Sequence, residues 1–121
     1  MKRGLIVLLL GISIGLSNMV FASDSMKDSQ MKYYSNIASC TQGTFPIGFL
    51  GAYYIYGIKD NKCQIKESLG GVDIICNLPA SVAKRYSYEG KKMLQESTTK
   101  GSGYSAYINQ IMNDPTYCKV K

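Results

Sequence analysis

The segment Gly57-Ile58-Lys59-Asp60-Asn61-Lys62-Cys63-Gln64-Ile65 decides the fold, because a turn-forming dipeptide stands in it between two runs with strand character. Aspartate and asparagine tolerate the positive φ angles of a tight hairpin turn. With Asp60-Asn61 as a two-residue loop, Ile58 lies opposite Cys63 and Tyr56 opposite Ile65. The sequence therefore predicts a β-hairpin centred on this dipeptide.

A second turn follows at Ser68-Leu69-Gly70-Gly71 and extends the hairpin into a three-stranded antiparallel meander. If Leu69-Gly70 is the loop, Cys63 lies directly opposite Cys76, which predicts a disulfide between them. By elimination, the second disulfide joins Cys40 to Cys118. The alternatives are reduced or metal-bound cysteines, but the chain has no C-x-x-C spacing and no histidine, which argues against a redox pair or a zinc site.

This register sorts the side chains of the meander onto two faces, since successive residues of a strand point to opposite sides. The predicted core face carries Tyr54, Tyr56, Ile58, Cys63, Ile65, Val72, Ile74 and Cys76. The other face presents a candidate protein-binding surface made of Tyr53, Ile55, Lys66 and Ile75. The alternative is that another layer of the chain covers this face. A bulge at Gly57 or a longer glycine turn would also shift the register.

Helical patterns flank the meander on both sides. We expect a helix over 26–39, a loop over 41–46 and then strand from about 48 to 58. A second helix follows Pro79 and is weakened or kinked at Gly90, because glycine is a poor helix former. After a flexible connector over 98–103, a last helix spans about 104–113. The sequence thus predicts a disulfide-stabilised α+β domain, with one N-terminal helix, three strands and two C-terminal helices.

The N-terminus has the pattern of a secretory signal peptide. Lys2-Arg3 precede an uncharged apolar stretch from Gly4 to Leu16, and Val20-Phe21-Ala22 supplies a small-residue cleavage site. We predict cleavage after Ala22, which leaves residues 23–121 as a single small domain in the periplasm or outside the cell, without a stable membrane span. The alternative is an uncleaved N-terminal anchor.

The amino-acid composition excludes several classes of catalytic and metal site. The 121 residues include no histidine, so the common nucleophilic triads and histidine-based metal sites are excluded. The carboxylates are scattered, and Glu67 and Asp73 are expected on opposite sides of the meander, which argues against a paired acid and base. We therefore expect no catalytic residue, no metal and no cofactor, with an enzyme as the least favoured alternative.

One basic cluster is predicted on the second helix. Lys84, Tyr88, Lys91 and Lys92 recur at helical spacing and form a candidate patch for an anionic surface. The simpler interpretation is the solvated side of an amphipathic helix. Nucleic-acid binding is not expected, because the positive charge is moderate and an exported protein seldom meets a genome.

The leading functional hypothesis is a small, exported, non-catalytic module that binds another protein of a bacterial envelope or of the extracellular space. A different class, kept as the alternative, is a secreted inhibitor or toxin-like effector that meets anionic surfaces through the basic helix. Both hypotheses require a well-ordered scaffold, although Ile, Leu, Val and Phe supply only 18 of the 99 residues from 23 to 121. Ten tyrosines and two disulfides are expected to compensate for this thin aliphatic core.

Overall fold

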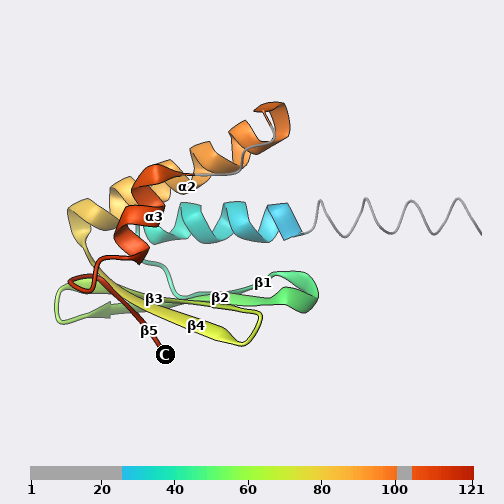
Figure 1. Cartoon of the computed structure of the whole chain (residues 1–121). Helices are drawn as coiled ribbons and strands as arrows, with labels where there is room; N and C mark the ends of the chain where they lie inside the picture. Colours follow the sequence, from blue (N-terminus) through green and yellow to red (C-terminus); the bar gives the residue numbers. More distant parts are fainter. Residues whose placement is uncertain (1–25, 101–104) are drawn as a thin grey trace, which may run out of the picture.

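The protein is described by a computed structural model over residues 26–100 and 105–121. An antiparallel sheet of five strands carries the helices on one face, which confirms the α+β class (Figure 1). A helix over 26–37 is followed by β1 (Gly43–Pro46), η1 (Gly48–Leu50), β2 (Gly51–Lys59), β3 (Lys62–Leu69), β4 (Val72–Pro79), α2 (Ala80–Lys100), α3 (Ala106–Met112) and β5 (Cys118–Val120). The predicted signal peptide, residues 1–22, lies outside the described residues.

The strands form a simple up-and-down sheet in chain order, and the hairpin between β2 and β3 confirms the predicted turn. Asp60 and Asn61 have φ angles of 54° and 64°, so both occupy the left-handed region that this turn requires. Ile58 lies opposite Cys63 as expected. The predicted pairing of Tyr56 with Ile65 is wrong, because Ile55 takes that place.

A β-bulge at Tyr56 causes this shift. Gly57 has a φ of 108°, and the side-chain amide of Gln42 donates a hydrogen bond of 2.8 Å to the backbone carbonyl of Tyr56. The extra residue reverses which side chains of β2 face the helices, because the side-chain period of a strand is two. Tyr54 and Tyr56, predicted in the core, are therefore partly exposed, with Tyr56 44% accessible. Ile58 keeps its predicted pairing with Cys63, but it is 67% accessible, so its predicted place in the core is also wrong.

The turn between β3 and β4 uses Gly70-Gly71 and not Leu69-Gly70, since Leu69 pairs with Val72. Both glycines have positive φ, a region that favours glycine because it has no Cβ. The register is displaced by two residues from the predicted one, so Cys63 lies opposite Leu78. A displacement of two keeps the same face buried, and Ile65 and Cys76 still point into the core.

The cysteines form two disulfides, but both predicted pairings are wrong. Cys40 is bonded to Cys63 and ties the turn after the N-terminal helix to β3. Cys76 is bonded to Cys118, its direct neighbour across the ladder between β4 and β5. The two-residue displacement of β4 removes Cys76 from the position opposite Cys63, which explains the exchange of partners.

Two short edge strands lie in segments where no strand was predicted. β1 falls in the predicted loop and pairs with β2, with Phe45 opposite Tyr53. Pro46 is tolerated there because an edge strand need not donate on its outer side. β5 follows Pro115 and pairs with β4. The meander is therefore the centre of a wider sheet.

The helices agree with prediction in number and differ at their ends. The first ends at residue 37, where a turn brings Cys40 to a φ of 51°. Helix α2 continues through Gly90 as one element and extends to Lys100, into the predicted connector. Helix α3 begins after the cap residue Ser105, whose side chain accepts a hydrogen bond from the backbone of Ile108.

The core lies between the helices and one face of the sheet. Tyrosine supplies much of it, as the thin aliphatic composition predicted: Tyr33 and Tyr86 are fully buried, and the ring centroids of Tyr33 and Tyr53 are 4.5 Å apart. Around these rings pack buried side chains from the helices and the sheet, among them Ile37, Ile47, Ile65, Leu78, Leu94, Ile108 and Ile111. Edge-tilted aromatic pairs of this kind add to the free energy gained by burial.

Candidate binding face

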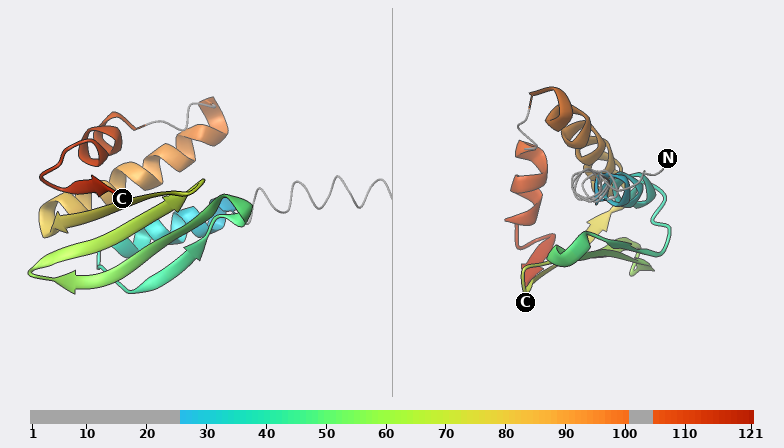
Figure 2. Two further views of the ribbon diagram at one scale, coloured as in Figure 1. Left: turned by 60° about the horizontal axis from the view of Figure 1, so that its bottom comes forward. Right: turned by 90° about the vertical axis from the view of Figure 1, so that its right-hand side faces the viewer.

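The face of the sheet opposite the helices is not covered by any described element. Figure 2 shows the helices stacked on one side of the sheet, with the strands forming the other surface of the molecule. On this side, which we call the open face, the side chains of β3 and β4 at alternate positions are only partly buried. The open face is therefore the first place to look for a binding site.

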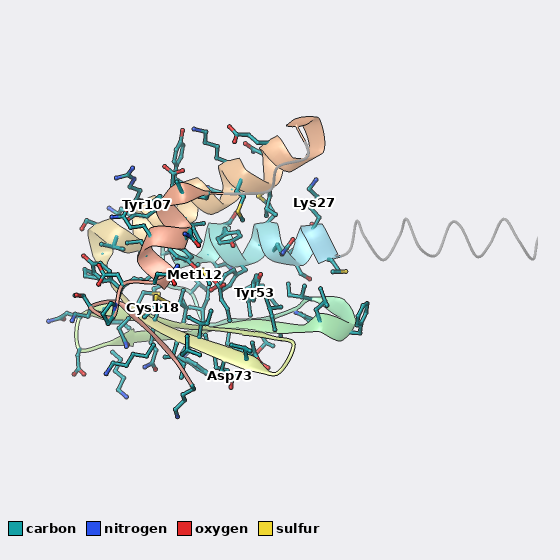
Figure 3. All side chains as sticks on the ribbon, in the orientation of Figure 1. Lys27, Tyr53, Asp73, Tyr107, Met112 and Cys118 are labelled. Atoms are coloured by element: carbon teal, nitrogen blue, oxygen red, sulfur yellow. A yellow bond between two sulfur atoms is a disulfide. The ribbon has the colours of Figure 1, made fainter. Side chains whose placement is uncertain are left out.

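The predicted binding surface is divided by the structure between the two sides of the sheet. Tyr53 and Ile55 are 5% and 2% exposed and pack under the helices, so their assignment to a binding surface is wrong. Burial raises the pKa of Tyr53 to about 12. Figure 3 shows Tyr53 between sheet and helices, with Asp73 on the opposite side. Lys66 and Ile75 do lie on the open face as predicted, and they pair across β3 and β4.

The bulge places two tyrosines of β2 on the open face. The rings of Tyr54 and Tyr56 are parallel to within 2°, with centroids 6.1 Å apart. Lys66 Nζ lies 4.7 Å from the centroid of the Tyr54 ring, a distance typical of a cation–π contact. A hydrogen bond with the Tyr56 side chain raises the pKa of Lys66, so this lysine stays charged. The three side chains form a flat aromatic surface with a fixed positive charge.

A shallow hollow of about 570 Å³ lies on the same side of the sheet, over β3, β4 and β5. Its floor includes the hydrogen-bonded amides of Gln64 and Asn77, with 3.2 Å between Gln64 Nε2 and Asn77 Oδ1. The remaining lining residues are Lys59, Asp60, Lys62, Ile75, Pro115, Thr116, Tyr117, Lys119, Val120 and Lys121. The lining side chains include four lysines and one aspartate, so they carry a net positive charge.

Within the described part of the chain, no lysine of the open face forms an ion pair. The ion pairs seen there join Lys32 to Asp28 and Arg85 to Glu89, all on helices. On the open face, Asp73 accepts a hydrogen bond of 2.6 Å from the Ser68 hydroxyl. Lys66 contacts the Tyr54 ring and the Tyr56 side chain and is also attracted by Asp73, so it is not a free charge.

The predicted polyanion patch on α2 is exposed as expected for a helix surface. Lys84 and Lys92 are exposed, Tyr88 is 60% accessible, and Lys91 is half-buried. Arg85, next to this patch, pairs with Glu89 and stacks over Tyr107, with its guanidinium carbon 4.2 Å from the ring centroid. The patch thus lies on the helical side of the molecule, away from the open face.

Sequence reasoning missed one buried polar cluster. The hydroxyls of Tyr33 and Tyr86 both donate hydrogen bonds of 2.8 Å to Glu67 Oε2. Glu67 is 4% exposed, and burial raises the pKa of its carboxyl although the two phenols oppose the shift. Glu67 and Asp73 lie on opposite sides of the sheet as predicted. Alternation along β3 could have indicated that Glu67 points inward, but nothing in the sequence paired it with two tyrosines more than 15 residues away.

Other features of the described residues bear on the class of protein. No three His, Cys, Asp or Glu side chains gather there as a metal site, and no helix there has the length and apolar character to cross a bilayer. The two disulfides are compatible with a periplasmic or extracellular location. Comparison with protein-family models, with curated proteins and with solved structures finds no match to this chain.

Proposed function

We propose that this protein is an exported, non-catalytic binding module that holds an acidic protein partner on its open face. The observation that carries the proposal is the combination, on one uncovered sheet surface, of a tyrosine pair with lysines that have no ion-pair partner among the described residues. A location outside the cytosol agrees with the disulfides and with the predicted signal peptide.

The apolar part of the open face has the character of an interface centre. Tyr54, Tyr56 and Ile75 offer large, rigid side chains, and tyrosine is enriched where protein partners make their strongest contacts. The stacking of the two rings holds them in place before binding, which lowers the conformational entropy lost on association.

The charged part of the open face sets the chemistry of the partner. Lys59 and Lys62 lie at the hairpin end of the sheet, and Lys119 and Lys121 lie along its β5 edge. Cations at the border of an apolar centre steer an acidic partner and contribute to specificity. A partner with aspartate or glutamate around an apolar contact fits this arrangement.

The test compares charge reversal on the two sides of the molecule. The mature chain, residues 23–121, is immobilised and used to recover partners from periplasmic and secreted proteins. We expect an acidic protein whose affinity falls at least tenfold in the double variant Lys62→Glu/Lys119→Glu and falls with increasing salt. The matched control Lys84→Glu/Lys92→Glu changes the same charge on α2 and should bind normally.

Each other outcome has a defined meaning. If the unmodified protein is retained on heparin or anionic vesicles and only the α2 variant loses binding, the result would favour the effector that meets anionic surfaces through the helix. Equal binding by all three proteins would reject the open face as the site. Replacement of Tyr54 or Tyr56 by alanine should weaken the same complex because it removes a ring from the proposed contact surface. The fold should be retained, since neither ring belongs to the buried core.

A further inference from the structure

A cluster of exposed apolar side chains lies at one end of the sheet, separate from the open face and from α2. Phe49 is 95% exposed, and its neighbours Leu50, Leu69 and Val72 are 43%, 36% and 48% exposed. We call these four residues the apolar end. They come from the η1 turn and from the two strand ends that flank the Gly70-Gly71 turn.

The apolar end is held rigidly by backbone hydrogen bonds. The Gly70 amide donates to the Leu50 carbonyl at 2.9 Å, which ties η1 to the β3–β4 turn. The Ile47 amide donates to the Gly51 carbonyl at 2.9 Å and closes the η1 loop itself. Gly51, with a φ of 147°, lies so close to the Ser68 carbonyl that no side chain fits there. Phe49 therefore projects from a convex, fixed turn.

The two segments that form the apolar end contain no charge. Residues 47–52 read IGFLGA and residues 69–72 read LGGV. Single exposed apolar residues are common, but a fully exposed phenylalanine beside three further apolar side chains on uncharged segments is not. Convex tips of this kind can enter the interface of a bilayer, where the apolar side chains leave water.

The sequence that precedes Met26 makes a lipid surface the occupant that fits. The described part of the N-terminal helix starts at this same end (Figure 1), where Met26 Sδ would lie 3.3 Å from a Cβ placed on Gly48. Nine residues separate Leu16, the end of the apolar stretch that starts at Gly4, from Met26. The ten peptide steps from Leu16 to Met26 span at most about 35 Å. While the leader is held in a membrane, the apolar end stays within that distance of the bilayer surface.

We propose that the apolar end inserts into the lipid interface of the membrane, with Phe49 as the principal inserting side chain. This inference does not depend on the proposed function, because it concerns another surface and another partner. The contact is weak once the leader is removed, since a few apolar side chains give only reversible binding. Insertion at this end leaves the open face, along the side of the sheet, free for a protein.

The chain contains no tryptophan, so one can be introduced as a unique probe. In the mature Phe49→Trp variant, added phosphatidylcholine vesicles in 0.5 M salt should shift the tryptophan emission to the blue, and brominated lipid should quench it. The neutral lipid and the salt suppress any contribution from lysines. The control Ile58→Trp replaces an apolar side chain, 67% exposed, at the other end of β2, and its emission should not change.

A second variant measures the contribution of the side chain. Phe49→Ser should lower the vesicle partition coefficient by about tenfold without changing the fold, because the ring contacts almost nothing in the protein. The proposal is overturned if Phe49→Trp shows no lipid-dependent shift, or if the control shifts equally. A blue shift that grows with protein concentration in the absence of lipid, together with dimers in sedimentation, would instead assign the apolar end to self-association.

Discussion

Replacement of Gly90 by alanine separates what the sequence predicts from what the packing predicts. Glycine in a helix interior is about 1 kcal/mol less favourable than alanine, so propensity alone predicts that Gly90→Ala stabilises α2. In the structure, a Cβ at this position would lie 2.5 Å from Tyr34 Cε1 and closer still to two other ring atoms. The Tyr34 ring lies directly on the backbone of α2, and only glycine leaves room for it.

The size of the destabilisation by Gly90→Ala depends on how far the Tyr34 ring can move to make room for a methyl group. Tyr34 is 3% exposed, and its centroid is 5.1 Å from that of Tyr33 and 6.1 Å from that of Tyr86. Overpacking of a filled core costs about 1–3 kcal/mol, and so direct an overlap belongs at the upper limit of that range. After subtraction of the propensity gain, we expect Gly90→Ala to destabilise the domain by about 2 kcal/mol. In a domain of this size that lowers Tm by roughly 10 °C.

The assay is urea unfolding of the oxidised mature chain, followed by far-ultraviolet circular dichroism. Lys92→Ala, at an exposed position of the same helix, is the control and should change the free energy of unfolding by less than about 0.5 kcal/mol. The double variant Gly90→Ala/Tyr34→Leu should be more stable than the sum of the single changes predicts, because the smaller side chain removes the overlap. A Gly90→Ala protein as stable as the wild type would refute this account of the helix interface.

Two further predictions concern the buried carboxyl and the disulfides. Burial raises the pKa of Glu67 above its ordinary value of 4.5, so the stability that the protonated carboxyl contributes is present below pH 4.5 and is lost as pH rises through the raised pKa. In urea unfolding at a series of pH values, Glu67→Gln should therefore gain stability relative to the wild type as pH increases. Parallel pH profiles of the two proteins would contradict this. Peptide mapping should find Cys40 bonded to Cys63 and Cys76 bonded to Cys118. Replacing both cysteines of a pair by serine should lower the free energy of unfolding by about 3 kcal/mol for Cys40–Cys63, which are 23 residues apart, and by about 4 kcal/mol for Cys76–Cys118, which are 42 residues apart. Recovery of a Cys63–Cys76 bridge would disprove the register.

The local features of the fold could be predicted because short-range geometry controls them. The Asp60-Asn61 turn, the helical character of α2 and α3, and the strand character of β2 to β4 each depend on the residues of one segment. The same holds for the importance of tyrosine in the core, which follows from composition. The edge strands β1 and β5 escaped prediction because a strand of three or four residues is defined by its neighbour in the sheet and not by its own pattern.

The candidate site was predicted only in part, and a single bulge explains most of the error. Lys66 and Ile75 were placed correctly, since β3 and β4 keep their faces under a displacement of two residues. Tyr53 and Tyr54 exchanged sides because the bulge at Tyr56 inserts one residue into β2. The sequence left a bulge at Gly57 open as an alternative, and the structure has a bulge beside it, at Tyr56. Gln42, which lies outside β2, stabilises the bulge, so the residues of β2 alone did not decide between the two registers.

The sequence by itself determined the class of fold, the position of the first hairpin and the presence of cysteines able to bridge, because each of these follows from local conformational preference or from residue type. Tertiary structure alone decided which cysteines pair, which face of β2 is buried, and where the lysines of β2, β3 and β5 come together. These depend on register, and register is fixed by contacts between segments far apart in the chain. A change of one or two residues in pairing costs little locally but reassigns every side chain across the sheet.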